Sequence, residues 1–352
     1  MPVDDAKAPL FAGVDVGGTN IKIGLVDSEG QMVAYEKMPT QVQKGPEDGT
    51  HRMAEAVLKM VRRVGLDQDE FPRIGLACPG TMDVPAGMLL EPHNLQGWWH
   101  CPIRDMLSHY SGRPVSFAND ANAAAFGEYW AGAGRQFQSM ILLTLGTGIG
   151  GGIITNGELV VGEHSCGGEV GHIIIDCRDD AVQDNAGKSG SLEAYASAGG
   201  VIKRAQLALD AGRKSSLNTR LKKEGTELTP LLIAKEAEKG DKLAKRVVLE
   251  TARYLGTGIA SLVHTVDPES AVLGGAMTFG GAESPLGQEF IETIRHEFDR
   301  RALGALRGRI HIDFASLGGD AGFIGAAGIA RRDHKIELAA EKEKEKEDSG
   351  SD

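Results

Sequence analysis

The sequence has few cysteines, few aromatic residues and no long apolar run. Only four of its 352 residues are cysteine, and their spacing shows no paired pattern of the kind that marks a disulfide framework. No stretch approaches the length of a membrane span, and the N-terminal "MPVDDAKAPLFAGVDV" carries acidic residues where a signal peptide needs basic ones. We therefore expect a reduced, soluble, cytoplasmic protein that does not act at a membrane.

Clustered basic charge is also missing. The net charge is −11, whereas nucleic-acid phosphates require grouped Lys and Arg side chains, so we expect no nucleic-acid partner. Part of the negative charge lies in the tail "ELAAEKEKEKEDSGSD", which has no apolar face, and we expect residues 335–352 to be disordered or frayed helix. The length, with 41% apolar residues, suggests two domains.

Residues 143–160, "LTLGTGIGGGIITNGELV", contain Gly146-x-Gly148-x-x-Gly151, the pattern of a dinucleotide-binding loop. Such a loop needs a helix directly after the glycines, so that the pyrophosphate meets the helix N-terminus. Here β-branched residues follow, and Asn156-Gly157 is typical of a hairpin turn. The sequence therefore predicts a glycine turn between two strands, and we reject the dinucleotide loop.

A similar turn occurs near the N-terminus, where "DVGGTN" (residues 15–20) joins two apolar runs. Each half of the chain thus begins with strand, glycine turn, strand, turn and strand, a weak internal repeat. Glycines let backbone N–H groups approach an oxyanion, although two plain hairpins would use them only for torsion. The pairing favours phosphate binding. Gly274-Gly275, after the apolar run of "HTVDPESAVLGGAMT", could likewise admit a flat ring or ribose, or simply connect a strand to a helix.

Periodicity predicts the remaining elements of the first half. Residues 46–66 have helical apolar spacing, and the Ala-rich residues 121–134 also predict a helix. The segments "RIGLACPG" and "PVSFAND" predict short buried strands. We expect two α/β lobes, each with a mixed sheet that starts with a three-strand antiparallel meander and continues with parallel strands.

Several of these motifs together resemble the ROK family of repressors and sugar kinases. "VDVGGTNIKIGLVD" and "LTLGTGIGGGIITNGELVVG" are similar to its two phosphate motifs, "DPESAVLGGAMT" to its adenosine motif, and "FANDANAAAFGE", "GGEVGHIIID" and "GSLEAYAS" stand between in the family's order. The resemblance runs from about Leu10 to about Arg332. It implies an α/β fold of two ribonuclease H-like (actin-like ATPase) lobes, with a cleft for nucleotide and sugar between them. The first lobe is expected to span residues 10–130 and the second residues 131–334, and the last helix is expected to pack back on the first lobe.

The resemblance also implies site residues. Asp120 of "NDAN" is expected to be the general base, although a carboxylate at a helix start could be a plain N-cap. Sugar ligands are expected to be Asn94, Asn119, Asp120, Glu169, His172 and Glu193, although a lone Glu or His is more often solvated or structurally satisfied. ATP is expected to contact Asp15, Gly17, Gly18, Thr19, Asn20, Gly146, Thr147, Gly148, Gly274 and Gly275, with Asp15 holding Mg²⁺ through water.

One segment departs from the family pattern. Many members bind zinc through Cys-x-Cys-Gly-x-x-Gly-Cys-x-Glu, but here Asp184, Ala186 and Ser191 replace the three thiolates. We therefore expect no structural zinc. Either other contacts order residues 182–189 or this loop is mobile without ligand, and the orientation of His172, which the metal normally helps to fix, is left open.

The favoured function is an ATP-dependent hexose kinase, with glucose phosphorylated on its 6-hydroxyl. Kinases for fructose, mannose, N-acetylglucosamine or N-acetylmannosamine are alternatives, as are polyphosphate as donor and a non-catalytic sugar-sensing regulator. A repressor needs a DNA-binding module before the first phosphate motif, where only about nine residues stand. A homodimer is a further expectation.

Overall fold

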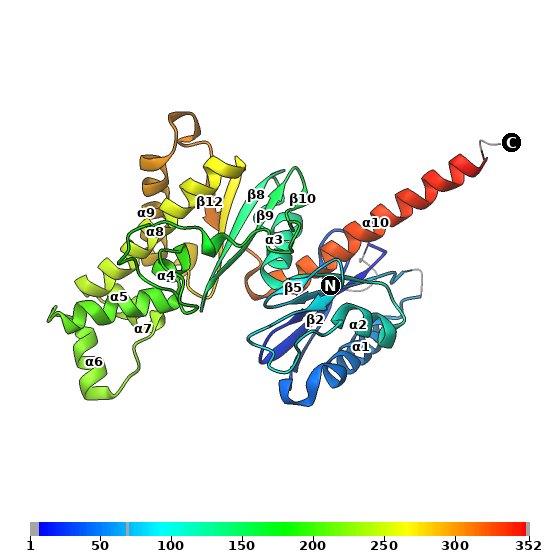
Figure 1. Ribbon diagram of the computed structural model, residues 1–352, viewed down its shortest axis with the longest axis horizontal. Coiled ribbons are helices and arrows are strands. Elements are labelled where there is room, and N and C mark those ends of the chain that lie inside the picture. The colour runs from blue at the N-terminus through cyan, green and yellow to red at the C-terminus, as the bar shows by residue number, and fades with distance from the viewer. Residues whose placement is uncertain (1–6, 68–69, 350–352) are drawn as a thin grey trace. The chain divides into compact units, whose positions relative to one another are not determined.

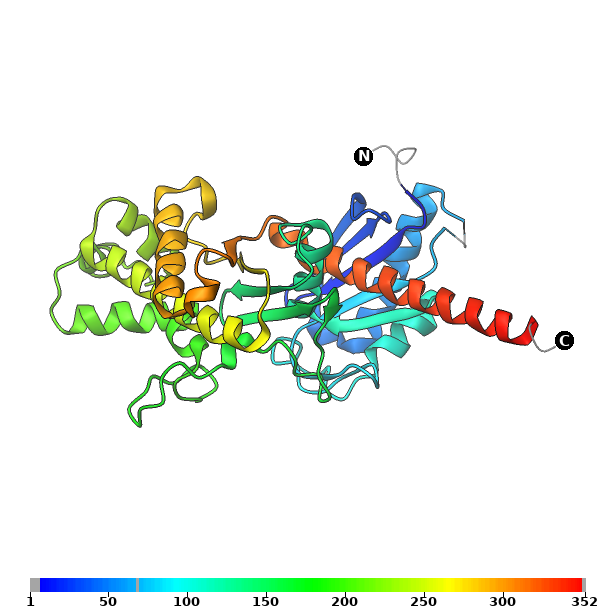
Figure 2. The ribbon, with the colours of Figure 1, turned by 90° about the horizontal axis from the view of Figure 1, so that it is seen from above.

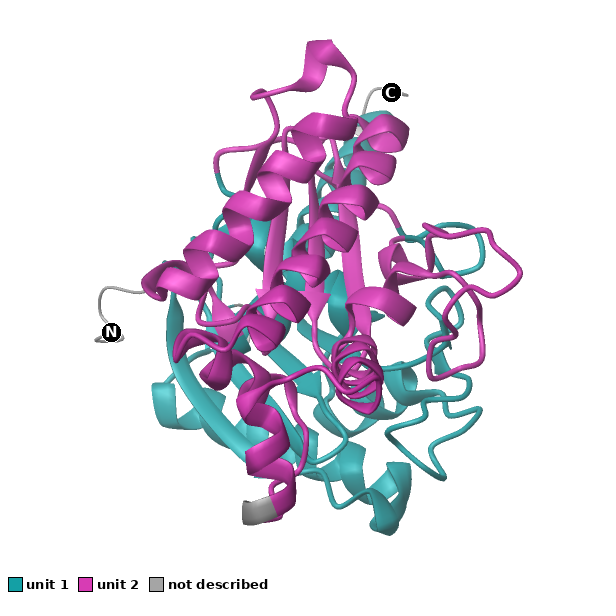
Figure 3. Ribbon diagram, turned by 90° about the vertical axis from the view of Figure 1, so that its left-hand side faces the viewer, with its two compact units in different colours: residues 1–135, 161–167, 319–352 teal, residues 136–160, 168–318 magenta. Residues whose placement is uncertain are grey.

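The chain forms two compact units in the computed structural model, which describes residues 7–67 and 70–349 (Figure 3). Unit 1 takes in the described residues of 1–135, 161–167 and 319–352, and unit 2 takes in 136–160 and 168–318. Each unit is built on one five-stranded mixed sheet covered by helices. Among the described residues, no helix combines the length and apolarity that crossing a membrane requires.

The sheet of unit 1 has the strand order β3-β2-β1-β4-β7. Neighbours among the first three strands pair antiparallel, and β4 and β7 continue parallel to β1, as predicted from the sequence. A small hairpin, β5-β6, stands apart from this sheet. The elements of unit 1 are β1 (Phe11–Val16), β2 (Asn20–Val26), β3 (Met32–Pro39), η2 (Val42–Lys44), α1 (Gly45–Val64), β4 (Ile74–Cys78), β5 (Met82–Asp83), β6 (Met88–Leu89), α2 (Ile103–Ser111), β7 (Val115–Asn119), α3 (Asp120–Ala131), η6 (Gly318–Asp320, whose first residue falls in unit 2) and α10 (Ala321–Ser349).

The alternation of side chains along β1 explains how this sheet is covered on both faces. Val14 and its even-numbered neighbours join a buried cluster with Met53 and Val57 of α1. Gly13 faces the other way, where α10 lies so close that an added Cβ would be 1.7 Å from the Phe323 carbonyl oxygen. Glycine is therefore required at 13 because the helix backbone occupies the place of a side chain.

The C-terminal helix α10 is longer than the sequence led us to expect. It starts at Ala321 against the sheet and α3, and it continues to Ser349, with residues 335–347 exposed (Figure 1). Of the two alternatives expected for this tail, disorder or frayed helix, the structure has helix over residues 335–349, and residues 350–352 lie outside the described part. Lys and Glu are good helix formers, and their alternation from Glu341 to Glu347 places opposite charges three residues apart.

The sheet of unit 2 repeats the topology of unit 1 with the order β10-β9-β8-β11-β12. Again three antiparallel strands are followed by two parallel ones, which confirms the predicted repeat. The elements are β8 (Met140–Leu145), β9 (Ile149–Thr155), β10 (Glu158–Leu159), η3 (Val170–His172), α4 (Leu192–Ala196), α5 (Ala198–Asp210), α6 (Ser216–Glu224), α7 (Pro230–Glu238), α8 (Lys242–Val266), β11 (Ser270–Gly275), η4 (Gly281–Glu283), α9 (Pro285–Arg301), η5 (Gly304–Leu306) and β12 (His311–Phe314). Figure 2 shows the strands of this unit beside its helices.

The segment after the Gly146 turn confirms that the chain has no dinucleotide-binding loop there. Strand β9 follows the glycines directly, where such a loop would need a helix. Asn156 and Gly157 both have positive φ, 52° and 82°, and join β9 to β10 as the two-residue hairpin that the sequence predicted.

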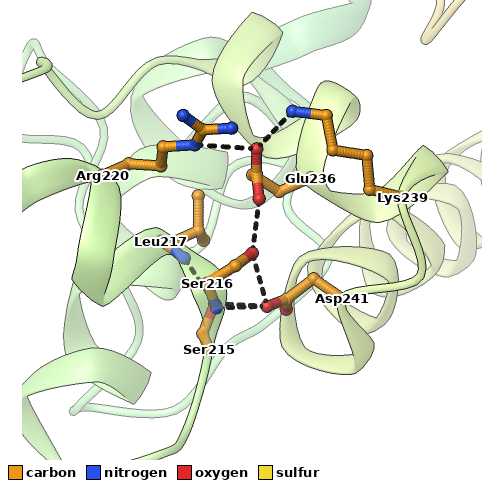
Figure 4. A network of polar contacts seen from close by, with 7 residues as sticks. All are labelled: Ser215, Ser216, Leu217, Arg220, Glu236, Lys239 and Asp241. Atoms are coloured by element: carbon orange, nitrogen blue, oxygen red, sulfur yellow. Dashed lines mark hydrogen bonds and ion pairs between the residues drawn. The ribbon is translucent and has the colours of Figure 1, made fainter. Parts of the chain in front are cut away.

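A polar network fixes the junction of α6, α7 and α8 (Figure 4). The buried carboxylate of Glu236 accepts hydrogen bonds from the Ser216 hydroxyl and from Arg220 and Lys239. Asp241 caps α8 at Ala244 and also accepts from Ser216. The hydrogen bond from Lys239, followed by that from Ser216, lowers the pKa of Glu236 to about 2. This network holds a helical layer of unit 2 together.

Candidate active site

Two carboxylates lie at one edge of the unit 1 sheet. Because β1, β4 and β7 are parallel, their carboxyl ends meet there, and these ends carry Asp15, Cys78 and Asn119-Asp120. The Cys78 thiol is fully buried, and burial, followed by the charges of Asp120 and Asp15, raises its pKa well above the ordinary value. The thiol therefore stays neutral between two acidic side chains.

Asn119 is the N-cap of α3, and Asp120 is the first helical residue. The Asn119 Oδ1 accepts the backbone N–H groups of Ala121 at 2.9 Å and Asn122 at 3.3 Å. Asp120 Oδ1 also accepts the Ala121 N–H, at 2.8 Å. The sequence left open that Asp120 is a plain cap. The structure gives that position to Asn119, which was expected as a sugar ligand.

Asp15 is partly buried beside the start of α10. A Cβ at Gly322 would lie 2.6 Å from Asp15 Oδ2, so glycine is what lets the helix reach the carboxylate. Burial raises the pKa of Asp15, and the positive charge of Lys22, its partner across β1 and β2, opposes that rise. Lys22 also donates to the Gly319 carbonyl. A nearby cation would stabilise the charged form of this carboxylate, which burial disfavours. Mg²⁺ is commonly bound by one or two protein carboxylates together with water and phosphate.

The first glycine turn is closed by its own backbone and by Thr40. The Gly17 N–H donates to the Asn20 carbonyl at 2.9 Å, while the Thr40 hydroxyl donates to the Gly17 carbonyl at 2.6 Å. Gly18 and Thr19, at the tip, are exposed. Asn94, an expected sugar ligand, lies against this tip, because a Cβ on Gly18 would be 3.0 Å from its carbonyl oxygen. The structure thus brings Asn94 to the first phosphate motif.

The second glycine turn and the adenosine-like motif lie at one edge of the unit 2 sheet. The Gly146 N–H donates to the Gly148 carbonyl at 3.0 Å, and Thr147 between them is exposed. Gly275 pairs with Leu145 at the end of β8, and a Cβ there would be 2.3 Å from the Leu145 carbonyl oxygen. With φ of 90°, Gly275 also has a backbone that favours glycine.

Glu193 supports the second glycine turn. Its Oε2 accepts the Ile149 N–H at 2.7 Å, and a Cβ on Gly148 would lie 2.4 Å from the same oxygen. The residue expected to bind sugar is therefore in direct contact with the turn expected to bind phosphate. Nothing in the sequence pattern predicted this contact.

His172 lies between two carboxylates. Its Nε2 is 3.9 Å from Glu169 Oε2, and its Nδ1 is 4.0 Å from Asp184 Oδ2. The Asp184 side chain is fully buried, whereas the Glu169 side chain is 52% exposed. The three expected sugar ligands of unit 2 thus come from η3 and α4. Glu169 is the N-cap of η3, His172 is the last residue of η3, and Glu193 lies in α4.

The loop without the zinc thiolates is ordered by hydrogen bonds. The buried Asp184 carboxylate accepts three donors of its own loop, and Asp176 accepts from Arg178 and from the Tyr195 hydroxyl. The Tyr195 oxygen also accepts the Val182 N–H at 3.1 Å. Within the described ranges, no group of three or more His, Cys, Asp or Glu side chains could hold a metal ion. The contacts of Asp176 and Asp184 therefore order this loop.

Sequence reasoning missed several supporting residues. The contacts of Thr40, Gly322 and Asp184 support the site, although these residues belong to none of the phosphate, adenosine or sugar motifs. Tyr195 lies within the sugar motif "GSLEAYAS", but the motif gave it no role. Asp184 had one signal, since "DNAGKSG" is rich in turn-forming residues and Asp commonly accepts backbone N–H groups two to four residues on. Trp98, by contrast, is a core residue that donates to the Val42 carbonyl, while Trp99 is exposed.

A family model named "ROK family" matches residues 11–333. The chain belongs to the ROK family. This assignment covers both units and agrees with the two sheets of matching topology.

Among ROK relatives, this chain is 35% identical to a glucokinase of Halalkalibacterium halodurans, over 92% of the chain and 95% of the relative. It is also similar to the crystal structure of a ROK hexokinase from Thermus thermophilus, with 31% identity, a TM-score of 0.78, and coverage of 93% and 99%. A ROK glucokinase from Streptomyces griseus, crystallised with glucose and AMPPNP, is 33% identical with a TM-score of 0.72, covering 92% and 99%. Both structures have the fold of actin-like ATPases, which this chain shares.

Proposed function

We propose that this ROK protein is an ATP-dependent hexose kinase that transfers the γ-phosphoryl group to the 6-hydroxyl of glucose. That it is a sugar kinase follows from its similarity to glucokinases along nearly the whole chain. Glucose as acceptor, the reacting hydroxyl and the residue roles are the proposal.

The observation that carries the proposal is the pair of carboxylates at the edge of the unit 1 sheet. Phosphoryl transfer needs a base for the acceptor hydroxyl and a metal that neutralises phosphate charge. Asp15 pairs with Ala77 near the end of β4, and Asn119, directly before Asp120, pairs with Cys78 at that same end, so both carboxylates stand at one end of the sheet. Asp120, at the first turn of α3, accepts the proton of the sugar hydroxyl.

Asp15 would hold Mg²⁺ through water. When bound, the ion neutralises charge on the phosphates. The exposed Gly18 and Thr19 supply backbone and hydroxyl donors to phosphate oxygens, and the exposed Thr147 is a further hydroxyl donor for phosphate. Gly274 and Gly275, at the end of β11, take the adenosine.

Unit 2 recognises sugar hydroxyls through Glu169, His172 and Glu193. Several carboxylate and imidazole groups suit a polyol, because each can pair with a hydroxyl that would otherwise be buried without a partner. In unit 1 we assign Asn94 and Asn119 as sugar ligands. The Asn119 Oδ1 already caps α3, so its Nδ2 is the atom we assign to the sugar.

Glucose is favoured as acceptor by the relative crystallised with glucose and AMPPNP, which also supports ATP as donor. Mannose, fructose, N-acetylglucosamine and N-acetylmannosamine differ from glucose at one or two positions, which a few loop contacts decide. Polyphosphate could replace ATP as donor, and a sugar-sensing regulator would bind the same sugars without catalysis. A turnover assay distinguishes these possibilities.

The test is coupled ADP release by the purified protein with Mg-ATP across these five sugars. We expect the highest kcat/KM with glucose. Turnover confined to an N-acetylhexosamine would overturn the acceptor. A parallel reaction with polyphosphate is followed by sugar phosphate formation, because polyphosphate yields no ADP, and product from polyphosphate but not from ATP would overturn the donor. Sugar binding without turnover on any sugar would favour the regulator.

A further inference from the structure

The buried carboxylate of Asp184 organises the loop between His172 and α4. Its Oδ1 accepts the backbone N–H groups of Ala186 and Lys188, both at 2.9 Å, and its Oδ2 accepts the Ser191 hydroxyl at 3.0 Å. The side chain has no exposed area. Although burial favours protonation, the Lys188 N–H, the Ser191 hydroxyl and the other donors lower the pKa of Asp184. Asp184 is therefore a fixed negative charge inside unit 2.

His172 offers a matching atom. Its Nδ1 is buried and has no hydrogen-bond partner, and the nearest acidic oxygen is Asp184 Oδ2 at 4.0 Å. A shift of about 1 Å brings the two atoms to hydrogen-bond distance. The other ring nitrogen, Nε2, lies on the side of the half-exposed Glu169. The ring thus has a buried anion at one nitrogen and an exposed carboxylate beyond the other.

We infer that Asp184 is a positioning residue for sugar binding: it accepts the Nδ1–H of His172 and so fixes the neutral tautomer in which Nε2 accepts a sugar hydroxyl beside Glu169. The identity of the ligand rests on the proposed function, whereas the tautomer does not. Which nitrogen of an imidazole carries the proton is set by the bond that the other nitrogen makes.

The position of Asp184 in the sequence agrees with this role. It stands at the first of the three places where the zinc pattern of the family has a thiolate. Here the buried Asp184 carboxylate orders the loop and faces the His172 imidazole. In relatives with the thiolates, a bound metal ion would order the loop and orient the imidazole. No metal is needed for the orientation of His172.

Asp184→Asn is the discriminating variant. The amide keeps an oxygen for the two loop N–H groups, but its nitrogen replaces the oxygen that faces His172. An N–H donor there favours the opposite tautomer, with the imidazole proton on Nε2, so His172 would meet the sugar as a donor rather than an acceptor. The loss of the acceptor for Ser191 is an accompanying cost in this variant.

Asp176→Asn is the matched control. Asp176 anchors the same loop through Arg178 and the Tyr195 hydroxyl, and its carboxylate pairs with these groups rather than with His172. Both variants remove one negative charge and loosen one loop anchor. Only Asp184→Asn changes the group opposite Nδ1.

The experiment is a long-range proton–nitrogen NMR spectrum of ¹⁵N-histidine-labelled protein at about pH 8, above the ordinary pKa of imidazole. The His172 signals are assigned by their loss in His172→Gln. We expect the Nδ1–H tautomer in the wild type and in Asp176→Asn, and the Nε2–H tautomer in Asp184→Asn. A wild-type Nε2–H tautomer, or identical His172 spectra for the two Asn variants, would overturn the inference.

Calorimetric glucose titration of the same samples separates the inference from the proposed function. We expect Asp184→Asn to weaken glucose binding by roughly 10-fold or more, and Asp176→Asn by much less. If the tautomers follow expectation but the wild type binds no sugar, the proposed function fails and the positioning by Asp184 stands. If Asp184→Asn does not fold, the wild-type spectrum alone decides the tautomer.

Discussion

The Glu193 carboxylate leaves no room for a methyl group on Gly148. A Cβ there would lie 2.4 Å from Oε2 and 3.1 Å from the carboxylate carbon. A Cβ on Gly146, in the same turn, would meet no atom within 4 Å. Gly148→Ala and Gly146→Ala therefore form a matched pair in which only the first displaces Glu193.

The magnitude follows from the hydrogen bond that Glu193 makes. To reach ordinary contact distance, Oε2 must move by about 1 Å, which breaks its 2.7 Å bond from the Ile149 N–H. Hydrogen bonds to charged groups contribute about 1.5–3 kcal/mol. We expect Gly148→Ala to lower the free energy of unfolding by about 2 kcal/mol and Tm by roughly 5 °C, and to weaken glucose binding because the carboxylate leaves its place.

The assay is thermal unfolding together with glucose titration in the absence of nucleotide, so that phosphate contacts do not enter. Gly146→Ala should stay near the wild type in both. In a Glu193→Ala background, Gly148→Ala should cost nothing further, because the clashing atom is gone. Equal losses for the two glycine variants, or additive losses in the double variant, would refute the reasoning.

Three further predictions concern unit 1. Asp120→Asn should lower kcat by at least about 100-fold with little change in glucose affinity, because it removes the base and keeps the shape of the side chain. Near-normal turnover would show that Asp120 is not the base. Gly325→Ala would place a Cβ 1.6 Å from a backbone carbonyl oxygen of α3 and should lower the free energy of unfolding by about 3 kcal/mol or more. Gly304→Ala is the control, because a Cβ there would meet no atom within 4 Å and should leave the stability unchanged. Urea unfolding of the two variants tests this difference. Burial raises the pKa of Cys78 well above its ordinary value and that of Cys101 to about 11. Above about pH 9 the unfolded chain therefore loses thiol protons that the folded protein keeps, and stability should fall by up to about 1.4 kcal/mol per pH unit for each thiol. Urea unfolding at about pH 8 and 10 should show a shallower fall when both thiols are replaced by alanine, and equal slopes would count against buried neutral thiols.

The sheet meanders could be predicted because their pattern is local. Alternating apolar residues and turn chemistry at Asn156-Gly157 determine strand, turn and strand without reference to the rest of the chain. The repeat of the glycine turn then indicated that both halves share one topology. Hence the two sheets follow the predicted plan of antiparallel and parallel neighbours.

The supporting contacts could not be predicted because they join residues far apart in sequence. Thr40 closes a turn at Gly17, and Gly322 gives room to Asp15. The length of α10 was underestimated because a charged segment without an apolar face gives no packing signal, although its helix propensity is high. The absence of the thiolates predicted that no zinc is bound, but it did not predict that the Asp184 carboxylate accepts the hydrogen bonds that order the loop.

The sugar residues show the same division. Motif order placed Glu169, His172 and Glu193 in one functional group, and the structure draws them from one region of unit 2. Motifs alone could not show that Glu193 also braces the phosphate turn, or that His172 faces a buried anion. Those relations depend on how η3, the following loop and α4 pack.

The most direct test of the central claim is the identity of the product. Wild-type protein is incubated with glucose and Mg-ATP, and the phosphorus NMR spectrum is compared with those of authentic glucose phosphates. We expect a single new sugar phosphate, glucose 6-phosphate, formed together with ADP and absent with Asp120→Asn. ATP hydrolysis without a sugar phosphate, or phosphate on another hydroxyl, would contradict it.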